Sequence, residues 1–292
     1  MAETLGDIKL PPVHSPLRET ARMFLRNYAA VLGLLILVTV VVVSLIGPYY
    51  YPNDPFEMVW APLAPPGEEG FPLGTDYLGR DLLAGIIFGG RATLTVGISA
   101  ALITIFIGIT VGALAGYYRG WVEELLMRLT ELFQVLPTLL FAMVIVALFG
   151  ASLTMVAIAI GVVSWTSIAR LTRSEFLKIR ELEYVKAARS IGASNKRIIW
   201  QVILPNALPT LVVQSALIVG VAILFEAGLS FLGLSDPNVM SWGLMIGSNR
   251  QYILDAWWGV TFPGCAIFLT VLSISLIGDG LNDALNPKLR ER

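Results

Sequence analysis

The sequence predicts an all-α membrane protein with six transmembrane helices, and three observations support this fold class. Of the 292 residues, 56% are hydrophobic and only 14% are charged, whereas an ordinary soluble domain has roughly 25% charged residues. The mean hydropathy is +0.75. Charged residues are also absent from five long stretches of the chain. This composition excludes a disordered chain, a coiled coil and a nucleic-acid-binding domain, and it leaves too few charges for the surface of a soluble enzyme.

Each charge-free stretch is long enough for at least one membrane crossing. A helix needs roughly 20 residues to cross a hydrocarbon core about 30 Å thick. Four stretches fit one crossing each, and residues 132–169 fit two, with a tight turn near Phe149–Ser152. Because the stretches are continuously apolar, they predict helices and not barrel strands. The predicted spans are residues 29–47, 93–116, 132–149, 152–169, 206–225 and 257–278.

The orientation follows from the arginines and lysines, because cytoplasmic loops of membrane proteins are enriched in them. The net charge is only −1, yet 17 of the 20 basic residues fall on one predicted side of the membrane. The other three, Arg80, Arg91 and Arg250, fall on the opposite side together with nine acidic residues. This asymmetry predicts that both termini are cytoplasmic. The basic side consists of residues 1–28, 117–131, 170–205 and 279–292.

Two segments flank the first predicted span. In the N-terminal cytoplasmic segment 1–28, Arg18, Arg22 and Arg26 are spaced four apart, which predicts a short interfacial helix over residues 15–28; a plain basic flank is the alternative. After the span, residues 48–91 form a long outer loop rich in proline, glycine and acidic residues. Loops of this length usually serve function or docking, although an ordered cap without a partner is also consistent with the pattern.

The rest of the chain divides into a five-helix core and a tail. The first span and outer loop together make residues 29–91, the core covers residues 92–280, and residues 281–292 form a cytoplasmic tail. In the second span Gly108, Gly112 and Gly116 recur every four residues and therefore lie on one helix face. Glycines in this arrangement predict the close approach of another helix.

The cytoplasmic segment 170–205 is the most informative part of the sequence. Tyr184, Ala187, Ala188 and Ile191 share one face of a predicted helix. The two alanines keep this face thin, so that a neighbouring protein could approach closely. The alternative is a solvated basic loop in which the alanines are incidental.

Two residues set the limits of that predicted helix and of the next span. Gly192 is placed to end the helix, since glycine accepts the left-handed conformation of a C-terminal cap. Pro205 is placed at the start of the fifth span, where its missing N–H group is not needed.

The residues that usually perform chemistry are scarce. The chain has one cysteine, Cys265, and one histidine, His14, which excludes an internal disulfide and argues against a histidine-based metal site or catalytic triad. Glu226 ends the fourth charge-free stretch at the outer end of the fifth span. It could line an outer vestibule, or it could pair with a basic group such as Arg91 or Arg250; we favour the second interpretation.

The pattern Glu183-x-x-x-Ala187-Ala188-x-x-x-Gly192, followed by Leu204-Pro205, resembles the cytoplasmic EAA signature of the membrane subunits of binding-protein-dependent ABC importers. Three further blocks narrow the resemblance to the dipeptide/oligopeptide/nickel permease family, and together the blocks cover about residues 70–292. Many members of that family have histidine where this chain has Gln201, and a proline-rich stretch where it has residues 235–240. The three blocks are residues 72–81, residues 226–234 with 241–243, and residues 278–287.

The resemblance implies the type I, MetI-like permease architecture in a bacterial or archaeal plasma or inner membrane. It also implies a heterodimer with a sister permease, two ATPase subunits and an extracytoplasmic solute-binding protein that delivers peptides or a related small solute. The sequence has no Gly-x-x-x-x-Gly-Lys-Ser/Thr phosphate loop, so we expect that this chain does not hydrolyse ATP itself. We also expect no enzymatic activity, no bound cofactor and no metal site on this chain. ATP and Mg²⁺ would be used by the ATPase subunits.

The same resemblance assigns roles to individual residues. The outer residues would meet the binding protein, and the cytoplasmic ones would dock on the ATPase. The candidates for binding-protein docking are Asp76, Arg80, Asp81, Phe231 and Trp242. The candidates for ATPase docking are Glu183, Tyr184, Ala187, Ala188, Arg189, Gly192, Ala193, Leu204 and Pro205.

Three other functions are alternatives to a permease subunit. A secondary transporter or channel driven by an ion gradient usually places acidic residues or histidine inside its spans, and the charge-free stretches lack them. An intramembrane enzyme would need a catalytic set that this chain does not offer. A scaffold that transports nothing would leave uptake unchanged when its gene is deleted.

Overall fold

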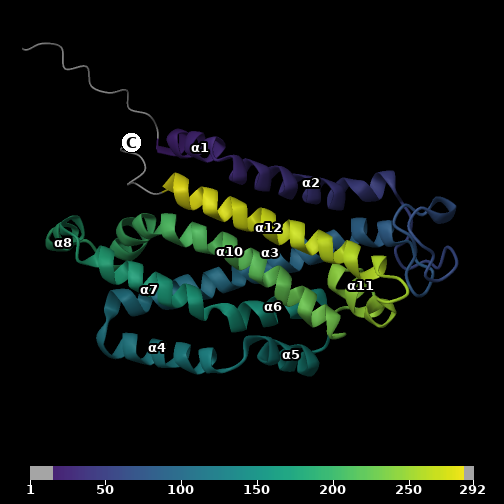
Figure 1. Cartoon of the computed structure of the whole chain (residues 1–292). Helices are drawn as coiled ribbons and strands as arrows, with labels where there is room; N and C mark the ends of the chain where they lie inside the picture. Colours follow the sequence, from purple (N-terminus) through teal and green to yellow (C-terminus); the bar gives the residue numbers. More distant parts are fainter. Residues whose placement is uncertain (1–15, 286–292) are drawn as a thin grey trace, which may run out of the picture.

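The computed structural model describes residues 16–285, and long helices dominate this part of the chain (Figure 1). Apart from two isolated bridges, Met58 with Arg80 and Thr75 with Asp81, its regular structure is helical. Residues 1–15 and 286–292 of the predicted terminal segments, including His14, lie outside the described residues. The helices are α1 (Pro16–Arg26), α2 (Tyr28–Tyr50), η1 (Glu68–Gly70), α3 (Leu82–Tyr118), α4 (Gly120–Val135), α5 (Thr138–Phe149), α6 (Leu153–Ser164), α7 (Thr166–Arg180), α8 (Glu183–Ser190), α9 (Asn195–Arg197), the π-helical turn η2 (Ile198–Ile203), α10 (Leu204–Phe231), α11 (Trp242–Asn249), η3 (Arg250–Tyr252) and α12 (Trp258–Leu285).

Four helical stretches are long and apolar enough to cross a membrane: α2, α3, the stretch 195–231 that ends in α10, and α12. Two bent pairs pass the same test when each is taken as one unit, α4 with α5 and α6 with α7. By length and composition the described residues therefore provide four to six spans. Each of the six predicted spans overlaps one of these units.

The two bent pairs differ in their bounds from the predicted spans 132–149 and 152–169. Between α4 and α5 the chain turns by 86° at Leu136, which is extended at φ −74° and ψ 130°. Pro137 explains the break, because its ring disfavours helical backbone in the residue before it and it has no N–H group. The predicted cytoplasmic segment 117–131 is therefore largely helix, and the helix expected over 132–149 begins only at Thr138.

The second break separates α6 from α7 by 44° at Trp165. The predicted span 152–169 consequently runs on as α7 to Arg180. Both α5 and α6 have 12 residues, about 18 Å of helix, which is too short to cross a hydrocarbon core alone.

The glycine stripe of α3 faces α7, as the sequence predicts. A Cβ atom added at Gly116 would lie 2.6 Å from Phe176 Cβ, and one added at Gly112 would meet Thr172 Cβ at 2.6 Å. At Gly108 the neighbour is the side chain of Ile168. These distances are shorter than a normal van der Waals contact, so only glycine permits this spacing between the two helices.

The bundle has two distinct ends. At one end lie α1, the last turns of α12 and the projecting helix α8; at the other lie the loop between α2 and α3 and the short helix α11 (Figure 1). The predicted N-terminal helix exists as α1, and Asn27 Nδ2 after it donates to Asp283 Oδ2 of α12 at 3.1 Å. Both ends of the described chain therefore lie at the same end of the bundle.

Candidate functional site

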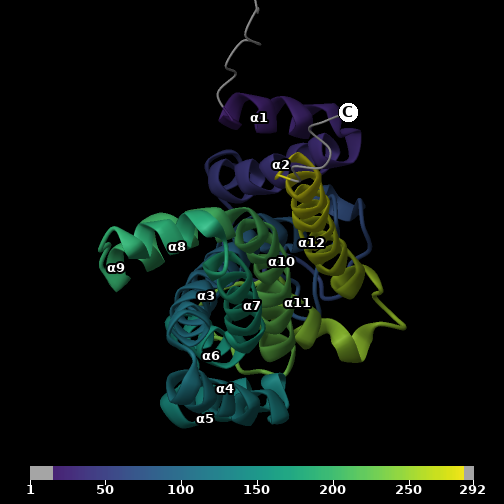
Figure 2. The same ribbon diagram turned by 90° about the vertical axis from the view of Figure 1, so that its left-hand side faces the viewer.

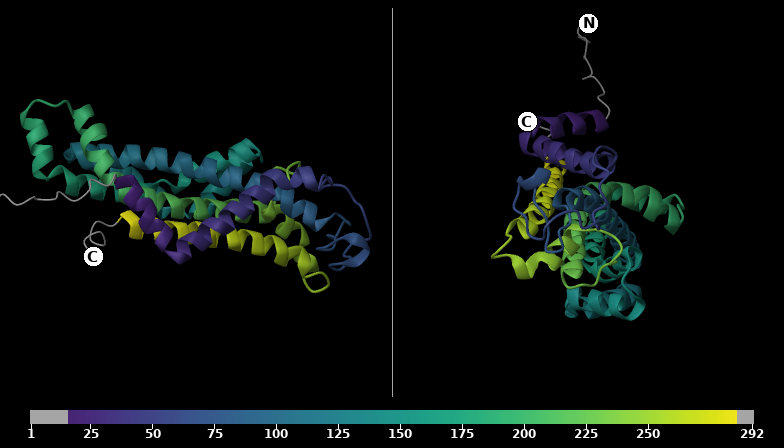
Figure 3. Two further views of the ribbon diagram at one scale, coloured as in Figure 1. Left: turned by 90° about the horizontal axis from the view of Figure 1, so that it is seen from above. Right: turned by 90° about the vertical axis from the view of Figure 1, so that its right-hand side faces the viewer.

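Helix α8 stands away from the bundle (Figures 2 and 3). It begins after Leu182, whose backbone is extended at φ −70° and ψ 147°, and it ends at Gly192, whose φ is +84°. Two backbone bonds close its end: Gly192 N–H donates to Arg189 O at 3.0 Å, and Ala193 N–H donates to Ala188 O at 3.1 Å. This pair of bonds is a Schellman motif, so the prediction that Gly192 ends the helix in a left-handed conformation is confirmed.

One side of α8 is fixed to the bundle by a buried contact. Val185 is fully buried in a cluster of apolar side chains that includes Ile198 and Ile199 from the turn before α10 and Phe176 from α7. The same cluster contains Tyr117 at the end of α3. A displacement of α8 would therefore be transmitted to α3, α7 and α10.

Polar contacts reinforce this junction around Tyr117. Its hydroxyl donates to Asn195 Oδ1 at 2.7 Å, and its carbonyl accepts from Arg180 Nη1 at 2.8 Å. The guanidinium of Arg189 lies over the Tyr117 ring at 5.8 Å from its centre. Of the candidate docking residues, Arg189 thus also holds α8 in place.

The opposite side of α8 is open. Tyr184 is 45% exposed and Ile191 is 85% exposed, and the small side chain of Ala187 lies exposed between them. Ala188 is half-buried, so the thin face centres on Ala187 more than the sequence pattern indicates. Glu183 occupies the first turn, where a carboxylate interacts favourably with the helix dipole.

The last two cytoplasmic candidates belong to a different element. Pro205 lies at the start of α10, where the sequence places it, and Leu204 is half-buried beside it. The six residues before them form the π-helical turn η2, a feature that the sequence does not predict. This turn joins α10 to α9 and so to α8.

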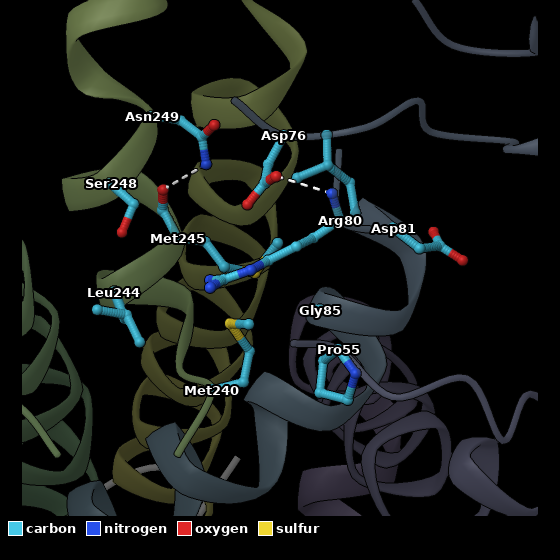
Figure 4. A pocket seen from close by; sticks show the side chains of 11 residues that line it. Pro55, Asp76, Arg80, Asp81, Gly85, Met240, Leu244, Met245, Ser248 and Asn249 are labelled. Carbon is cyan, nitrogen blue, oxygen red and sulfur yellow. Dashed lines mark hydrogen bonds between the residues drawn. The ribbon is translucent and has the colours of Figure 1, made fainter. Parts of the chain in front are cut away.

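At the other end of the bundle, two predicted docking residues are buried. Asp76 is 6% exposed and its Oδ1 accepts from the N–H groups of Leu78 and Arg80, both at 2.8 Å (Figure 4). Burial raises the pKa of Asp76 above its ordinary value, partly offset by these backbone bonds. Asp81 is 1% exposed and caps α3, where its Oδ1 accepts from Leu83 N–H at 2.9 Å.

The remaining outer candidates divide between the interior and the surface. Trp242 is 2% exposed, and its indole N–H donates to Ile86 O at 2.9 Å. Arg80 is half-buried against the Phe56 ring, whereas Phe231 is 37% exposed. Three of the five predicted docking residues are therefore buried in this chain, and the docking role of the set stays a prediction.

Asp76, Asp81 and Trp242 are buried at this end of the bundle, where Asp81 caps α3 and Trp242 packs in the apolar core. Large apolar side chains exposed at this end include Met58, Trp60, Ile253, Leu254 and Trp257.

Glu226 does not form the ion pair that the sequence suggests. It is 1% exposed, and its Oε1 accepts from Ser230 Oγ at 2.7 Å, while Oε2 has no hydrogen-bond partner among the described residues. Arg91 instead donates to Ser44 O and Leu45 O at 3.0 and 2.8 Å, and Arg250 donates to Phe231 O at 2.7 Å. In this structure Glu226 is enclosed and does not line an open vestibule.

We expect Tyr51→Phe to lower the free energy of unfolding by about 1 kcal/mol, because Tyr51 Oη donates to Asp81 Oδ2 at 2.5 Å. Burial, followed by this bond, raises the pKa of Tyr51 to about 12. The contribution is therefore complete below about pH 10, where an unfolded tyrosine begins to ionise, and it is lost as the pH rises through about 12. Melting temperatures of both proteins in detergent from pH 8 to 12 test this, and a difference that stays constant over the whole range would contradict it.

Comparison with known proteins decides the family. Residues 108–291 match the family described as the binding-protein-dependent transport system inner membrane component. The chain belongs to this family. Residues 15–66 of this inner membrane component also match the N-terminal transmembrane domain of oligopeptide transport permease C, so the family that the EAA-like signature indicates is confirmed.

Curated relatives match this inner membrane component over nearly their whole length. It is 42% identical over 283 residues to the di/tripeptide transport system permease protein DppC of Pseudomonas aeruginosa (strain UCBPP-PA14), covering 94% of this chain and 93% of that protein. It is 37% identical to the glutathione transport system permease protein GsiD of Pectobacterium atrosepticum, covering 99% and 97%. It is 38% identical to the oligopeptide transport system permease protein OppC of Haemophilus influenzae, covering 94% and 89%.

A solved structure shows the same fold. A chain from inward-facing conformations of the MetNI methionine ABC transporter superimposes with a TM-score of 0.59 at 20% identity, covering 69% of this chain and 96% of that chain. The inner membrane component is thus an all-α membrane protein with the MetI-like fold.

Proposed function

We propose that this chain is one of two permease subunits of an ATP-driven importer, and that it moves peptides or peptide-like solutes delivered by a solute-binding protein. The family match and the peptide permeases among its relatives support this. The observation that carries the proposal is α8, a capped helix with an exposed small-residue face that is fixed to the bundle on its other side. A sister permease would complete the path.

We further propose six spans with both termini in the cytoplasm. The bent pairs α4–α5 and α6–α7 would each count as one crossing, which adds two to the four straight helices. The basic residues support this orientation, because the α8 end of the bundle holds most of them and the outer end has a net negative charge. In this arrangement α1 lies at the inner leaflet and the five-helix core covers residues 92–280.

The mechanism that we propose couples α8 to the spans as a lever. An ATPase subunit would receive the exposed face around Ala187, with Tyr184 and Ile191 on either side. When the ATPase pair closes on ATP and Mg²⁺, α8 would move, and the buried contacts of Val185 and Tyr117 would turn α3, α7 and α10 as one body. The cavity between the two permeases would then open to the opposite side of the membrane.

At the outer end, we propose that the binding protein rests on the exposed part of the outer loop and on the segment around α11. Phe231 and the surface of Arg80 are available for this contact. The buried residues Asp76, Asp81 and Trp242 would act by holding that surface in shape.

The test is uptake of a labelled neutral dipeptide by cells that lack this gene and by the same cells carrying it on a plasmid. We expect uptake only in the complemented cells, and we expect it to fall when ATP is depleted but to persist when an uncoupler collapses the proton gradient. The opposite pattern would favour an ion-gradient-driven transporter, for which the buried carboxyl of Glu226 would be the natural ion or proton site. Unchanged uptake without the gene would favour a scaffold subunit.

A further inference from the structure

A cavity of about 240 Å³ lies among α3, α5, α6, α7 and α10, away from both ends of the bundle. Half of its lining side chains are polar, and none of them carries a charge. This composition is unusual beside the large apolar clusters that fill the rest of the bundle. The polar lining residues are Thr104, Thr138, Ser164, Thr166, Ser167 and Gln214; the apolar ones are Val163, Leu217, Ile218, Val221, Ala222 and Phe225.

Both broken helix pairs break at this cavity. Thr138 is the first residue of α5 after the 86° bend, while Ser164 and Thr166 flank the 44° bend between α6 and α7. Non-helical backbone at membrane depth is tolerated only where protein buries it or where it lines a water-filled cavity. The start of α5 also has no side-chain cap, so its first N–H groups are free to bind a ligand or water beside Thr138.

Of the polar side chains that line the cavity, Thr104 Oγ1 donates to Gly161 O at 3.4 Å, whereas others make no hydrogen bond within the described residues. Elsewhere in the bundle, hydroxyls of Thr110, Ser215 and Thr270 donate to the carbonyl four residues earlier, each at 2.7 Å. Ser164 Oγ is buried and has no hydrogen-bond partner among the described residues, and no hydrogen bond of the Gln214 amide occurs there either. A buried hydroxyl without a protein partner calls for an explanation, and binding of a polar ligand or water is one that fits the polar lining of this cavity.

The chemistry of the lining points to peptide groups. Each peptide unit offers one N–H donor and one C=O acceptor, and the hydroxyl and amide side chains can serve both. A cavity without charge interacts with this backbone, which all peptides share, and does not select for the charge of their side chains. Its volume of about 240 Å³ is below the range of pockets that enclose a whole small ligand, so it would hold part of the solute at a time.

We propose that this cavity is a peptide-backbone contact site on the translocation path, in which Ser164, Gln214 and Thr138 form hydrogen bonds with the amide groups of the passing solute. The proposal rests on the proposed function, since it presumes that this chain imports peptides. It adds that neutral hydrogen bonds, and not ion pairs, hold the solute at this depth.

The first experiment is the double variant Ser164→Ala and Gln214→Met, which removes two hydrogen-bonding groups at nearly constant volume. We expect the KM for uptake of a labelled neutral dipeptide to rise about five- to tenfold, with unchanged amounts of protein in the membrane. Ser215→Ala is the matched control, because Ser215 lies next to Gln214 on α10 but donates to Leu211 O and is not among the lining residues. Its uptake should equal that of the wild type.

The second experiment, Gln214→Glu, places a negative charge in the cavity. For each dipeptide, uptake by the variant is divided by uptake by the wild type, so that any preference of the binding protein for one dipeptide cancels. This ratio should be at least tenfold lower for an anionic dipeptide than for a cationic one. A wild-type KM in the double variant, together with equal ratios for the two dipeptides in Gln214→Glu, would overturn the proposal. These outcomes leave the proposed function intact as long as uptake still requires the chain; peptide uptake without the chain would overturn the function itself.

Discussion

Replacing Ala187 by arginine is expected to reduce ATP-driven uptake at least 100-fold while leaving the amount of protein in the membrane unchanged. Ala187 is exposed at the centre of the open face of α8, and Val185 anchors the helix from its other side. The long charged side chain therefore has room in the isolated chain and should not disturb its fold. In the complex it would stand where the ATPase surface has to approach, and its burial there would leave a charge without a partner.

The measurement combines dipeptide uptake with co-purification of the ATPase subunits through a tag on this chain. Both should be lost in Ala187→Arg, whereas Ala187→Ser, which adds one small polar atom, should retain both. Normal uptake by the arginine variant would show that the open face of α8 is not a docking surface. Loss of uptake with normal ATPase recovery would place the defect after docking.

The sequence predicted the helical class and α8 because each depends on local properties. Charge-free stretches are long runs of the chain, and the end of α8 is determined at Gly192 by a single glycine whose φ is positive. The close approach of a helix to the glycine stripe that includes Gly112 can likewise be predicted, because its glycines recur every four residues. Such features need no knowledge of distant contacts.

The errors arose where distant parts of the chain meet. Asp81 is an example: besides capping α3 it accepts from Tyr51 Oη, 30 residues away, and only this packing shows that the side chain is buried. The predicted ion pair of Glu226 fails because Arg91 and Arg250 donate to backbone carbonyls elsewhere in the chain. The hydrogen bond that Glu226 does make is local, since Ser230 lies one turn away on the same helix.

The bends in the helices and the polar cavity could not be predicted from the sequence either. Pro137 signals a kink, but neither its angle nor the second break at Trp165 follows from composition. The hydroxyl and amide side chains of the cavity come from five helices, and singly each of them is an ordinary residue of a membrane helix. Only the packing brings them together.

Gly112→Ala is expected to lower the melting temperature of the purified protein by several degrees, although it adds a single methyl group. The added Cβ would lie against the carbonyl oxygen of Ala169 and 2.6 Å from Thr172 Cβ. Because the carbonyl belongs to helical backbone, it cannot turn aside as a flexible side chain would, and α7 must move away from α3. Overpacking of this kind costs about 1–3 kcal/mol.

The matched control is Gly264→Ala in α12, where an added Cβ meets no atom within 4 Å. Alanine is the better helix former by about 1 kcal/mol, so this variant should melt at the same temperature as the wild type or higher. If the melting temperature falls in Gly112→Ala but not in Gly264→Ala, contact between α3 and α7, and not helix propensity, determines the effect of the added methyl group.

Because α7 leads directly into α8, we also expect Gly112→Ala to lower uptake per molecule by severalfold. A displaced α7 would transmit less of the motion of the ATPase from α8 to the membrane spans. Equal melting temperatures and equal uptake for the two variants would contradict the view that α3 and α7 move as one rigid body.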